Sequence, residues 1–460
     1  MPIQIVPPDP SEHRLFLTSG LGLKEAQDRY YERRRALVEK VGHPILITAV
    51  PQDPNRNIPW SHIDAPIYQD PLFTFLTGIL QPGLVLLIHP SNPMGCLFLP
   101  PYRAKKTFWE GFHFGVGDPS AEQRVQSITG ISDLSALSTM LETVLSTLKT
   151  HEGQKLGLFW EQSAKTSRIY PDYHQDFRKR LRRSLIQAGL SPQSIVNISE
   201  TVWPFRLTLD KLDQAHLLDA NISCHEAFSE ILRNRPWSNE GKLAGTLIGH
   251  LRSRSHQGLS FPPIVASGAQ ATTLHYTAND QPIHPESLVL LDFGLRRHAM
   301  HADISRTIPA KGRFNPMQRI LYESVLETQY FVEQNVKPGV TLRHLNAIAW
   351  PKMFDLLAKN FTNKGGKMHL PYQKIPHNIG HLLGYQVHDG DAFRDYRESP
   401  LQAGWVITNE PGLYGHFSWT FQGISYEETL GIRIEDNLLI TASGSKNLTS
   451  CPKQVEDLEY

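Results

Sequence analysis

The stretch from Leu288 to Phe314 contains two aspartates whose positions require a compensating charge. Asp292 follows four consecutive apolar residues and is therefore expected at the end of a buried strand. A carboxylate there is costly unless a partner compensates it. Asp303 follows eleven residues later, and if the chain reverses around Arg297 and His298, the two aspartates lie directly opposite each other on one hairpin face. Because like charges at neighbouring positions repel, this arrangement predicts a cation between them.

Further potential ligands follow in the C-terminal half. Glu410 lies in WVITNEPGLY and Glu435 in LGIRIEDNLLI, each interrupting a strand-like segment. The segment PHNIGHLLGYQVHDGD adds His377, His381 and His388. Any one of these residues alone could lie on a polar surface. Together they form an oxygen-rich set with too many charges for one ion, and carboxylate and imidazole ligands without thiolates suit two divalent cations such as manganese, cobalt or zinc.

The histidine cluster also permits a simpler interpretation. His377 and His381 are spaced as i and i+4, which on a helix would place them on one face like the pair of an HExxH zinc peptidase. Asn378 stands where that motif has its general-base glutamate, so this alternative is weaker than a site shared with the carboxylates.

Bulk composition excludes several classes of protein. A length of 460 residues predicts two or three domains. The formal net charge of +1 lacks the basic excess of a general nucleic-acid binder. The three widely separated cysteines favour neither a disulfide framework nor a CxxC zinc site, and they indicate a reducing, cytoplasmic compartment. Because apolar segments stay well short of the roughly 18 residues of a membrane span, we expect no membrane insertion.

Apolar patterning predicts a mixed α/β domain in residues 1–203. Helices are expected over 23–41, which ends at Gly42, over 134–149 and over 173–188. Strands are expected at HPILITAV, LFTFLTGI, LVLLIHP, CLFLP and KLGLFW.

Residues 204–460 are expected to form a second domain with curved antiparallel strands, in an α/β or α+β arrangement. Helices are predicted over 209–234, 316–334 and 342–359, and strands over 288–292, 405–409 and 431–440. The connection between Glu410 and Glu435 is expected to be a loop that borders the site.

Four segments resemble the metal-binding motifs of the aminopeptidase P and prolidase family, whose catalytic domain has the pita-bread fold. They are DFGLRRHAMHADISRTIPAKGRF, HNIGHLLGYQVHD, NEPGLY and GIRIED, in this order. The resemblance implies two divalent metal ions, Mn²⁺ foremost, with Co²⁺ or Zn²⁺ as alternatives. It implies that Asp303 and Glu435 bridge both ions, and that the five ligands are Asp292, Asp303, His381, Glu410 and Glu435.

The same resemblance implies roles for residues around the metals. The segment FPPIVASGAQATTLHYTAND is similar to the family segment whose histidine faces the substrate, so His275 is a candidate for stabilising the tetrahedral intermediate; otherwise it is a loop histidine. His388 would approach the scissile carbonyl or the residue before it, and His377 would line the proline pocket. Arg433 and Tyr414 would hold the ligands in place, with a purely packing role as the alternative.

The first half also resembles the N-terminal domain of aminopeptidase P, in ERRRALVEKV, PIYQDPLFTFLTG and FWEGFHFG. Trp109 aligns with a tryptophan that in some members reaches a neighbouring subunit's active site; the alternative is a tryptophan that packs in a core. The resemblance therefore implies a dimer or tetramer.

The function implied is that of an Xaa-Pro aminopeptidase, which hydrolyses the bond between an N-terminal residue and a following proline by metal-activated hydroxide. Glu410 would carry the proton to the leaving nitrogen. The alternatives are an Xaa-Pro dipeptidase and a non-catalytic scaffold with the same fold. The presence of all five ligands counts against the scaffold.

Overall fold

The computed structural model describes two compact units, one ending at Arg206 and one beginning at Leu207. The described residues are all except 1–16, 18–21, 52–68, 106–112, 119, 151–154, 161–172, 256, 391–395 and 460. Trp109 lies outside the described residues. Among the described residues, none of the helices has the length and apolar character that crossing a membrane requires.

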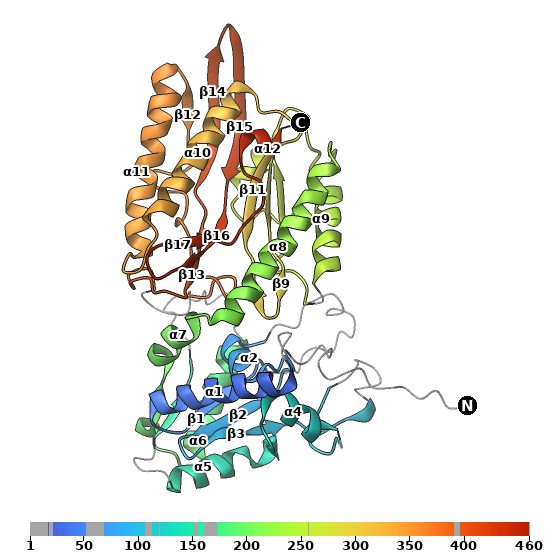
Figure 1. Cartoon of the computed structure of the whole chain (residues 1–460), viewed down its shortest axis with the longest axis vertical. Helices are drawn as coiled ribbons and strands as arrows, with labels where there is room; N and C mark the ends of the chain where they lie inside the picture. Colours follow the sequence, from blue (N-terminus) through green and yellow to red (C-terminus); the bar gives the residue numbers. More distant parts are fainter. Residues whose placement is uncertain are drawn as a thin grey trace, which may run out of the picture. The chain divides into compact units, whose positions relative to one another are not determined.

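The first unit is a six-stranded mixed sheet with helices on its faces (Figure 1). The strand order is β4-β3-β2-β1-β5-β6, in which β1, β2 and β3 are antiparallel neighbours and the outer pairs are parallel. Its elements are α1 (Leu23–Val41), β1 (Ile45–Thr48), α2 (Pro71–Thr77), β2 (Val85–His89), β3 (Asn92–Leu99), α4 (Ala121–Thr129), β4 (Asp133–Ala136), α5 (Met140–Thr150), β5 (Leu156–Leu158), α6 (Tyr173–Gln187), β6 (Ile195–Asn197) and α7 (Ser199–Leu207).

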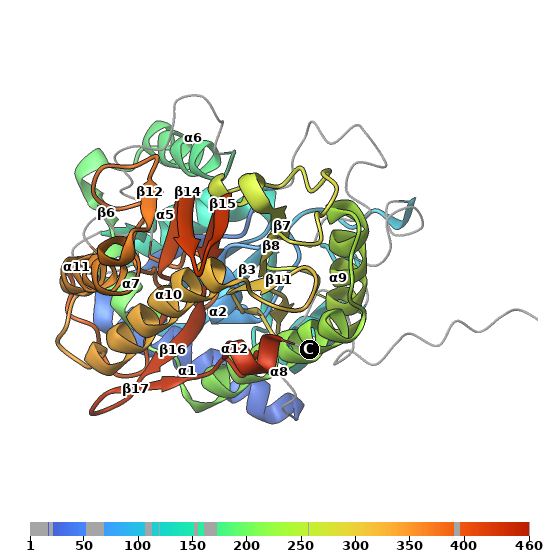
Figure 2. The ribbon, with the colours of Figure 1, turned by 90° about the horizontal axis from the view of Figure 1, so that it is seen from above.

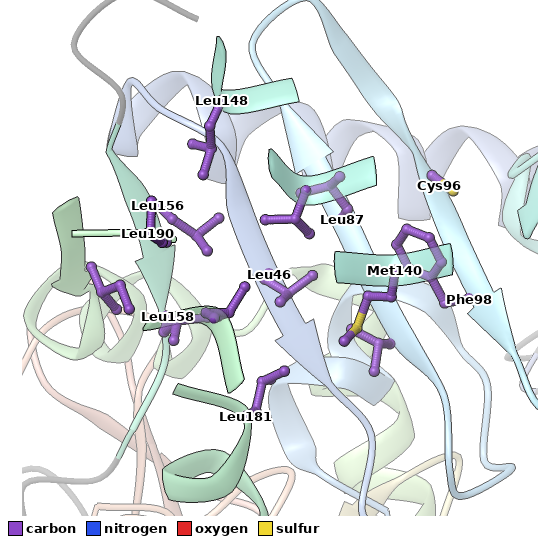
Figure 3. Packing of buried hydrophobic residues seen from close by; sticks show 14 residues of the cluster. Leu46, Leu87, Cys96, Phe98, Met140, Leu148, Leu156, Leu158, Leu181 and Leu190 are labelled. Atoms are coloured by element: carbon purple, nitrogen blue, oxygen red, sulfur yellow. The ribbon is translucent and has the colours of Figure 1, made fainter. Parts of the chain in front are cut away.

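Hydrocarbon side chains fill the core of this unit (Figure 3). Leu46, Leu87 and Phe98 project from neighbouring strands and pack against Met140 of α5 and Leu181 of α6. The alternation of side chains across a strand places them all on one face. Burial of such side chains, at roughly 1.5–3 kcal/mol each, stabilises the unit.

Two predictions for the first unit were wrong. LFTFLTGI is not a strand, because its apolar residues form α2: Asp70 caps the helix by accepting from the Phe73 N–H, and Gly78 ends it with a φ of 67°. A fully buried apolar run does not reveal its period, so the caps decide. The helix expected from residue 134 begins only at Met140, because 133–136 pair with β3.

The second unit surrounds three three-stranded antiparallel sheets and the two-stranded ribbon β10-β9 with four long helices. In Figure 1, α10 and α11 lie to one side of the strands, and α8 and α9 lie to the other; Figure 2 gives the view from above. The sheet orders are β11-β8-β7, β12-β14-β15 and β13-β16-β17. The helices are α8 (Lys211–Arg233), α9 (Glu240–Arg254), α10 (Pro316–Asn335), α11 (Leu342–Asn360) and α12 (Val455–Leu458). The strands are β7 (Ile264–Ser267), β8 (Leu288–Phe293), β9 (Arg296–Arg297), β10 (Met300–His301), β11 (Ile304–Pro309), β12 (Lys367–His369), β13 (Val406–Asn409), β14 (Gly412–Phe421), β15 (Ile424–Arg433), β16 (Asp436–Ile440) and β17 (Ser445–Asn447).

The connection between Glu410 and Glu435 is not the expected loop. It folds into the hairpin of β14 and β15, which pair from Gly412 with Arg433 to Phe421 with Ile424. The strand predicted over 431–440 is also interrupted, because β15 ends at Arg433 and β16 begins at Asp436. Glu435 therefore lies in a break between two strands rather than inside one.

Candidate metal centre

The two aspartates lie on one hairpin, but not directly opposite each other. In the pairing of β8 with β11, Asp292 faces Ser305. β9 and β10 continue the hairpin to a two-residue turn at His298 and Ala299, whose φ values are 49° and 65°. The predicted turn, at Arg297 and His298, was one residue too early. The observed turn shifts the pairing partner of Asp292 by two residues, from Asp303 to Ser305. Asp303 is thus a diagonal neighbour of Asp292 on the same face, still near enough for their charges to interact.

The two glutamates have the arrangement that was expected of the aspartates. Asn409 pairs with Asp436 on one side of the break, and Gly412 pairs with Arg433 on the other. Continuing this register through the break sets Glu410 opposite Glu435. The Glu435 N–H donates to the Ser305 carbonyl at 3.0 Å, which joins this second hairpin to the first.

Three of the predicted ligands converge closely. Asp303, His381 and Glu435 are buried and each offers a ligand atom within 4.8 Å of the others. His381 Nε2 lies 3.4 Å from Asp303 Oδ2 and 3.7 Å from Glu410 Oε1. Its Nδ1 lies 3.1 Å from the Leu382 carbonyl, which can only accept, so Nδ1 carries a proton and Nε2 faces the carboxylates. A cation between Nε2 and these oxygens would satisfy them all.

Asp292 is held by Arg433 and keeps one oxygen for another partner. Arg433 Nη2 donates to Asp292 Oδ2 at 2.6 Å, its Nε donates to Ser305 Oγ at 2.9 Å, and Ser305 Oγ donates to Glu435 Oε2 at 2.8 Å. Within the part of the chain that the structure describes, Asp292 Oδ1 is buried and has no hydrogen-bond partner. Such an orphaned oxygen beside other carboxylates fits a metal ligand.

The electrostatics of the cluster indicate missing positive charge. Burial raises the pKa of Asp292 to about 7 against the opposing effect of Arg433, with Asp303 adding to the rise. Burial and the charges of Asp303 and Glu410 raise the pKa of Glu435 well above its usual range. Burial lowers the pKa of His381, but the contact with Asp303 and the charge of Glu410 outweigh it and raise the value to about 9. Divalent cations would reverse these shifts by supplying the charge.

Hydrogen bonds through the Tyr414 hydroxyl connect the imidazole of His377 to Arg433 of the cluster. His377 Nδ1 lies 2.8 Å from the Asn378 carbonyl and 3.7 Å from Glu410 Oε2, and its Nε2 lies 3.0 Å from the Tyr414 hydroxyl. The carbonyl fixes the proton on Nδ1, so Tyr414 donates to Nε2 and its oxygen accepts from Arg433 Nη1 at 3.1 Å. Burial lowers the pKa of His377, as this neutral tautomer requires.

The other predicted residues lie at the edge of this cluster. The His388 ring is exposed and contacts the His381 ring, with their centroids 4.2 Å apart. His275 is exposed, and a positive charge on its ring would lower the pKa of His377. The segment from His377 to His381 is not helical, so the two histidines do not form an HExxH-type pair.

Ser305 and Asn437 belong to the site and were missed. Asn437 Nδ2 donates to the Asp303 carbonyl at 2.5 Å, and the Asp303 N–H donates to Asn437 Oδ1 at 3.2 Å. Their type carries little signal in a sequence. Ser305 follows Asp303 by two residues, and Asn437 follows Glu435 by two. Because side chains in a strand alternate between its faces, this spacing places each on the face of its ligand and could have identified them.

Comparisons with known proteins show which family this chain matches. Residues 215–442 match the model of metallopeptidase family M24, and residues 30–151 match that of the aminopeptidase P N-terminal domain. The chain is 30% identical to the mitochondrial intermediate cleaving peptidase 55 of Arabidopsis thaliana, over 98% of this chain and 86% of that protein. It is 28% identical to Xaa-Pro aminopeptidase 3 of Rattus norvegicus, over 98% and 89% of the two chains.

Solved structures show the same fold. Icp55 of Saccharomyces cerevisiae is 25% identical with a TM-score of 0.74 over 93% of this chain and 95% of that one. A putative aminopeptidase P of Bacillus anthracis is 23% identical with a TM-score of 0.75, over 94% and 97%. These likenesses confirm the expected fold, in which an α/β domain is followed along the chain by a pita-bread domain. The chain belongs to metallopeptidase family M24, as a hydrolase with an N-terminal domain of the aminopeptidase P type.

Proposed function

We propose that this hydrolase is an Xaa-Pro aminopeptidase, which releases an N-terminal residue that precedes proline. The observation that carries the proposal is the approach of Asp303, His381 and Glu435 to within 4.8 Å, in a chain that combines the M24 and aminopeptidase P N-terminal regions. The relatives named Xaa-Pro aminopeptidase support it. We assign residues 1–203 and 204–460 to the two domains.

We assign two divalent cations to the site, Mn²⁺ foremost, held by the five predicted ligands. When bound, such cations polarise a carbonyl oxygen and lower the pKa of a coordinated water toward about 7. Glu410, the least buried of the four carboxylates, accepts a proton at one oxygen and delivers it to the leaving nitrogen. His275 and His388 donate N–H groups to the developing oxyanion.

Proline selectivity follows from shape rather than hydrogen bonding, because a prolyl nitrogen in a peptide has no N–H. Tyr414 packs in an apolar cluster with the partly buried Leu274, Tyr276 and Tyr372. His377 contacts Tyr414 edge to face, with the ring centroids 5.6 Å apart. The partly exposed rings of this group, His377, Tyr276 and Tyr372, suit a rigid pyrrolidine ring.

The decisive experiment compares an Xaa-Pro-Yaa tripeptide, the Xaa-Pro dipeptide and a matched Xaa-Ala-Yaa tripeptide. Chelator-stripped protein is assayed with and without Mn²⁺. We expect Mn²⁺ to restore cleavage of the proline tripeptide and to leave the alanine peptide nearly uncleaved. Cleavage of the dipeptide alone would make the protein an Xaa-Pro dipeptidase, and no recovery with Mn²⁺, Co²⁺ or Zn²⁺ would contradict the metal assignment.

Two further predictions remain separate from this activity. A dimer or tetramer is checked by light scattering of the purified protein. The cytoplasmic location stays a prediction, and cell fractionation tests it against the mitochondrial location that the name of the Arabidopsis relative states.

A further inference from the structure

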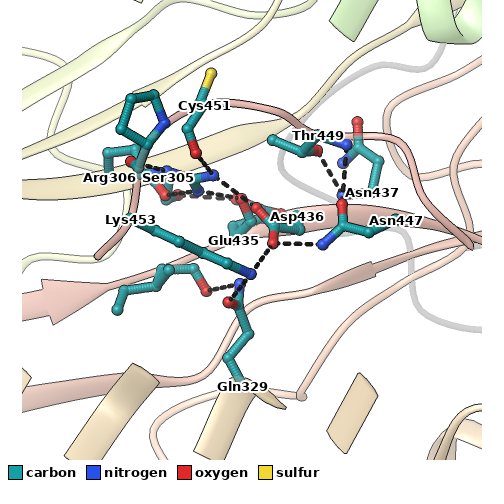
Figure 4. A network of polar contacts seen from close by, with 12 residues as sticks. Ser305, Arg306, Gln329, Glu435, Asp436, Asn437, Asn447, Thr449, Cys451 and Lys453 are labelled. Carbon is teal, nitrogen blue, oxygen red and sulfur yellow. Dashed lines mark hydrogen bonds and ion pairs between the residues drawn. The ribbon is translucent and has the colours of Figure 1, made fainter. Parts of the chain in front are cut away.

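A buried polar network lies behind the ligand-bearing strands, centred on Asp436 (Figure 4). Side chains alternate along a strand, so Ser305 and Glu435 face the metal cluster while Arg306 and Asp436 point to the opposite side. The side chains of Arg306 and Asp436 are fully buried. Asp436 Oδ1 accepts from Arg306 Nη2 at 2.7 Å, and its Oδ2 pairs with Lys453 Nζ.

This network holds the main chain on both sides of the Glu435 side chain. Arg306 Nη1 donates to the carbonyls of Ser305 at 2.8 Å and Glu435 at 2.7 Å. Gln329 Nε2, from α10, donates to the carbonyl of Ile434 at 3.0 Å. The peptide groups before and after the Cα of Glu435 are thus both fixed from behind.

The same glutamine reaches the other glutamate of the cluster. Gln329 Nε2 also lies 3.3 Å from the carbonyl of Asn409, the residue before Glu410, and the Asn409 side chain donates back to the Gln329 carbonyl at 2.9 Å. Lys453 Nζ donates to Gln329 Oε1 at 2.7 Å, which orients the amide so that its Nε2 points at the two carbonyls. One side chain therefore ties the two opposed glutamates together at their backbones.

We propose that Gln329 and Lys453 are positioning residues that set the spacing of Glu410 and Glu435 for two metal ions. The inference rests on the proposed dinuclear function. Desolvating Lys453, Asp436 and Arg306 offsets much of their mutual attraction, so the network contributes little net stability. What it adds is direction, because Arg306 Nη1 and Gln329 Nε2 each donate to main-chain carbonyls at or beside the ligands. A shift of the Gln329 amide moves both glutamates relative to each other.

The test uses the whole chain with Gln329→Met, which removes the amide contacts with both carbonyls and with Lys453, and Lys453→Met, which releases the amide. Stepwise Mn²⁺ affinities are measured by calorimetry, and the paired-ion signature by electron paramagnetic resonance. In these variants we expect the second Mn²⁺ to bind about ten- to hundredfold more weakly than in the unmodified protein, which is the usual cost of losing a residue that orients metal ligands. The kcat should fall with KM little changed, and Lys453→Arg should recover most of the affinity.

The control is Leu247→Ala on α9, a fully buried side chain of the same unit that is distant in sequence from every ligand. It should lower the melting temperature without weakening either Mn²⁺. Variants of Gln329 and Lys453 that lose only melting temperature, like this control, overturn the proposal. Gln329→Glu is added as a polar replacement of similar size. If this variant, Gln329→Met and both Lys453 variants all fail to fold, the proposal is overturned as well.

The outcome is distinguishable from failure of the proposed function. Hydrolysis of the proline tripeptide by the unmodified protein tests the function. The ratio of metal affinities between variant and unmodified protein tests the positioning role, whatever peptide is cleaved.

Discussion

The cores of the two units differ in the chemistry that they bury. The first unit packs Leu46, Leu87 and Phe98 into a hydrocarbon cluster (Figure 3). The second unit buries Asp292, Asp303 and Glu435 beside Arg433, and behind them Arg306 with Asp436 (Figure 4). Apolar burial is non-directional and needs no ligand. A buried cluster with excess carboxylates is complete only with added cations, so the second unit gives up part of its stability for a reactive site.

The largest expected effect is that of removing a ligand. Asp303→Asn keeps the shape but loses the charge that faces His381, and we expect activity to fall by at least about 10³-fold, beyond the ten- to hundredfold typical of groups that merely orient ligands. Metal stoichiometry by mass spectrometry under native conditions should fall too. Asp70→Asn is the matched control, because Asp70 is a buried aspartate paired with Arg178 in the first unit. Full metal occupancy in Asp303→Asn would contradict its role as a ligand.

In the first unit we expect the reverse pattern, in which a substitution lowers stability and leaves metal binding unchanged. Phe98 is fully buried, and Phe98→Ala should destabilise that unit by about 3–5 kcal/mol through lost burial and a cavity. Hydrogen exchange of peptides from β1 to β3 measures the loss. Mn²⁺ affinity should not change. Equal loss of protection in β13 and β16 would show that the two cores are coupled.

The pH dependence of the metal-free second unit comes next in size. The folded-state pKa of His381 is raised to about 9. The contribution of this residue to the free energy of unfolding is therefore fully present below about pH 6.5 and is lost as pH rises toward 9. We expect a loss on the order of a few kcal/mol over this range. Below pH 6.5 two effects oppose each other, because burial raises the pKa of Asp292 to about 7 and lowers that of His301 to about 3.

Hydrogen exchange of β13 and β16, corrected for intrinsic rates, measures this loss between pH 6.5 and 9. Saturating Mn²⁺ should reverse the slope, because metal binding requires neutral imidazole and strengthens as pH rises. Strands β1 to β3 serve as the internal reference. Rising protection of β13 and β16 with pH in the metal-free protein would be incompatible with a protonated His381.

The smallest effect is expected from Tyr414→Phe. It removes the hydroxyl that donates to His377 Nε2 and accepts from Arg433 Nη1, while the ring stays in its apolar cluster. The kcat/KM for the proline tripeptide should fall about tenfold, or ~1.4 kcal/mol. Metal stoichiometry should remain unchanged. A variant with full activity would leave Tyr414 with the packing role alone.

Local pattern determined much of this protein. Gly42 and the apolar spacing before it predicted α1 with its observed bounds, Leu23–Val41. The motifs around Asp292, His381, Glu410 and Glu435 identified the family, because residue type and spacing can be recognised in a sequence without knowing which residues are in contact. The helix α2 was missed because its buried residues hide their period.

Only the tertiary structure decided which oxygens meet. A turn placed one residue differently moves Asp303 from opposite Asp292 to its diagonal, and nothing local in the sequence distinguishes the two registers. The opposition of Glu410 and Glu435 depends on a hairpin that was expected to be a loop. Gln329 and Lys453 come from distant segments, so their link to both glutamates exists only once α10 packs against the strands.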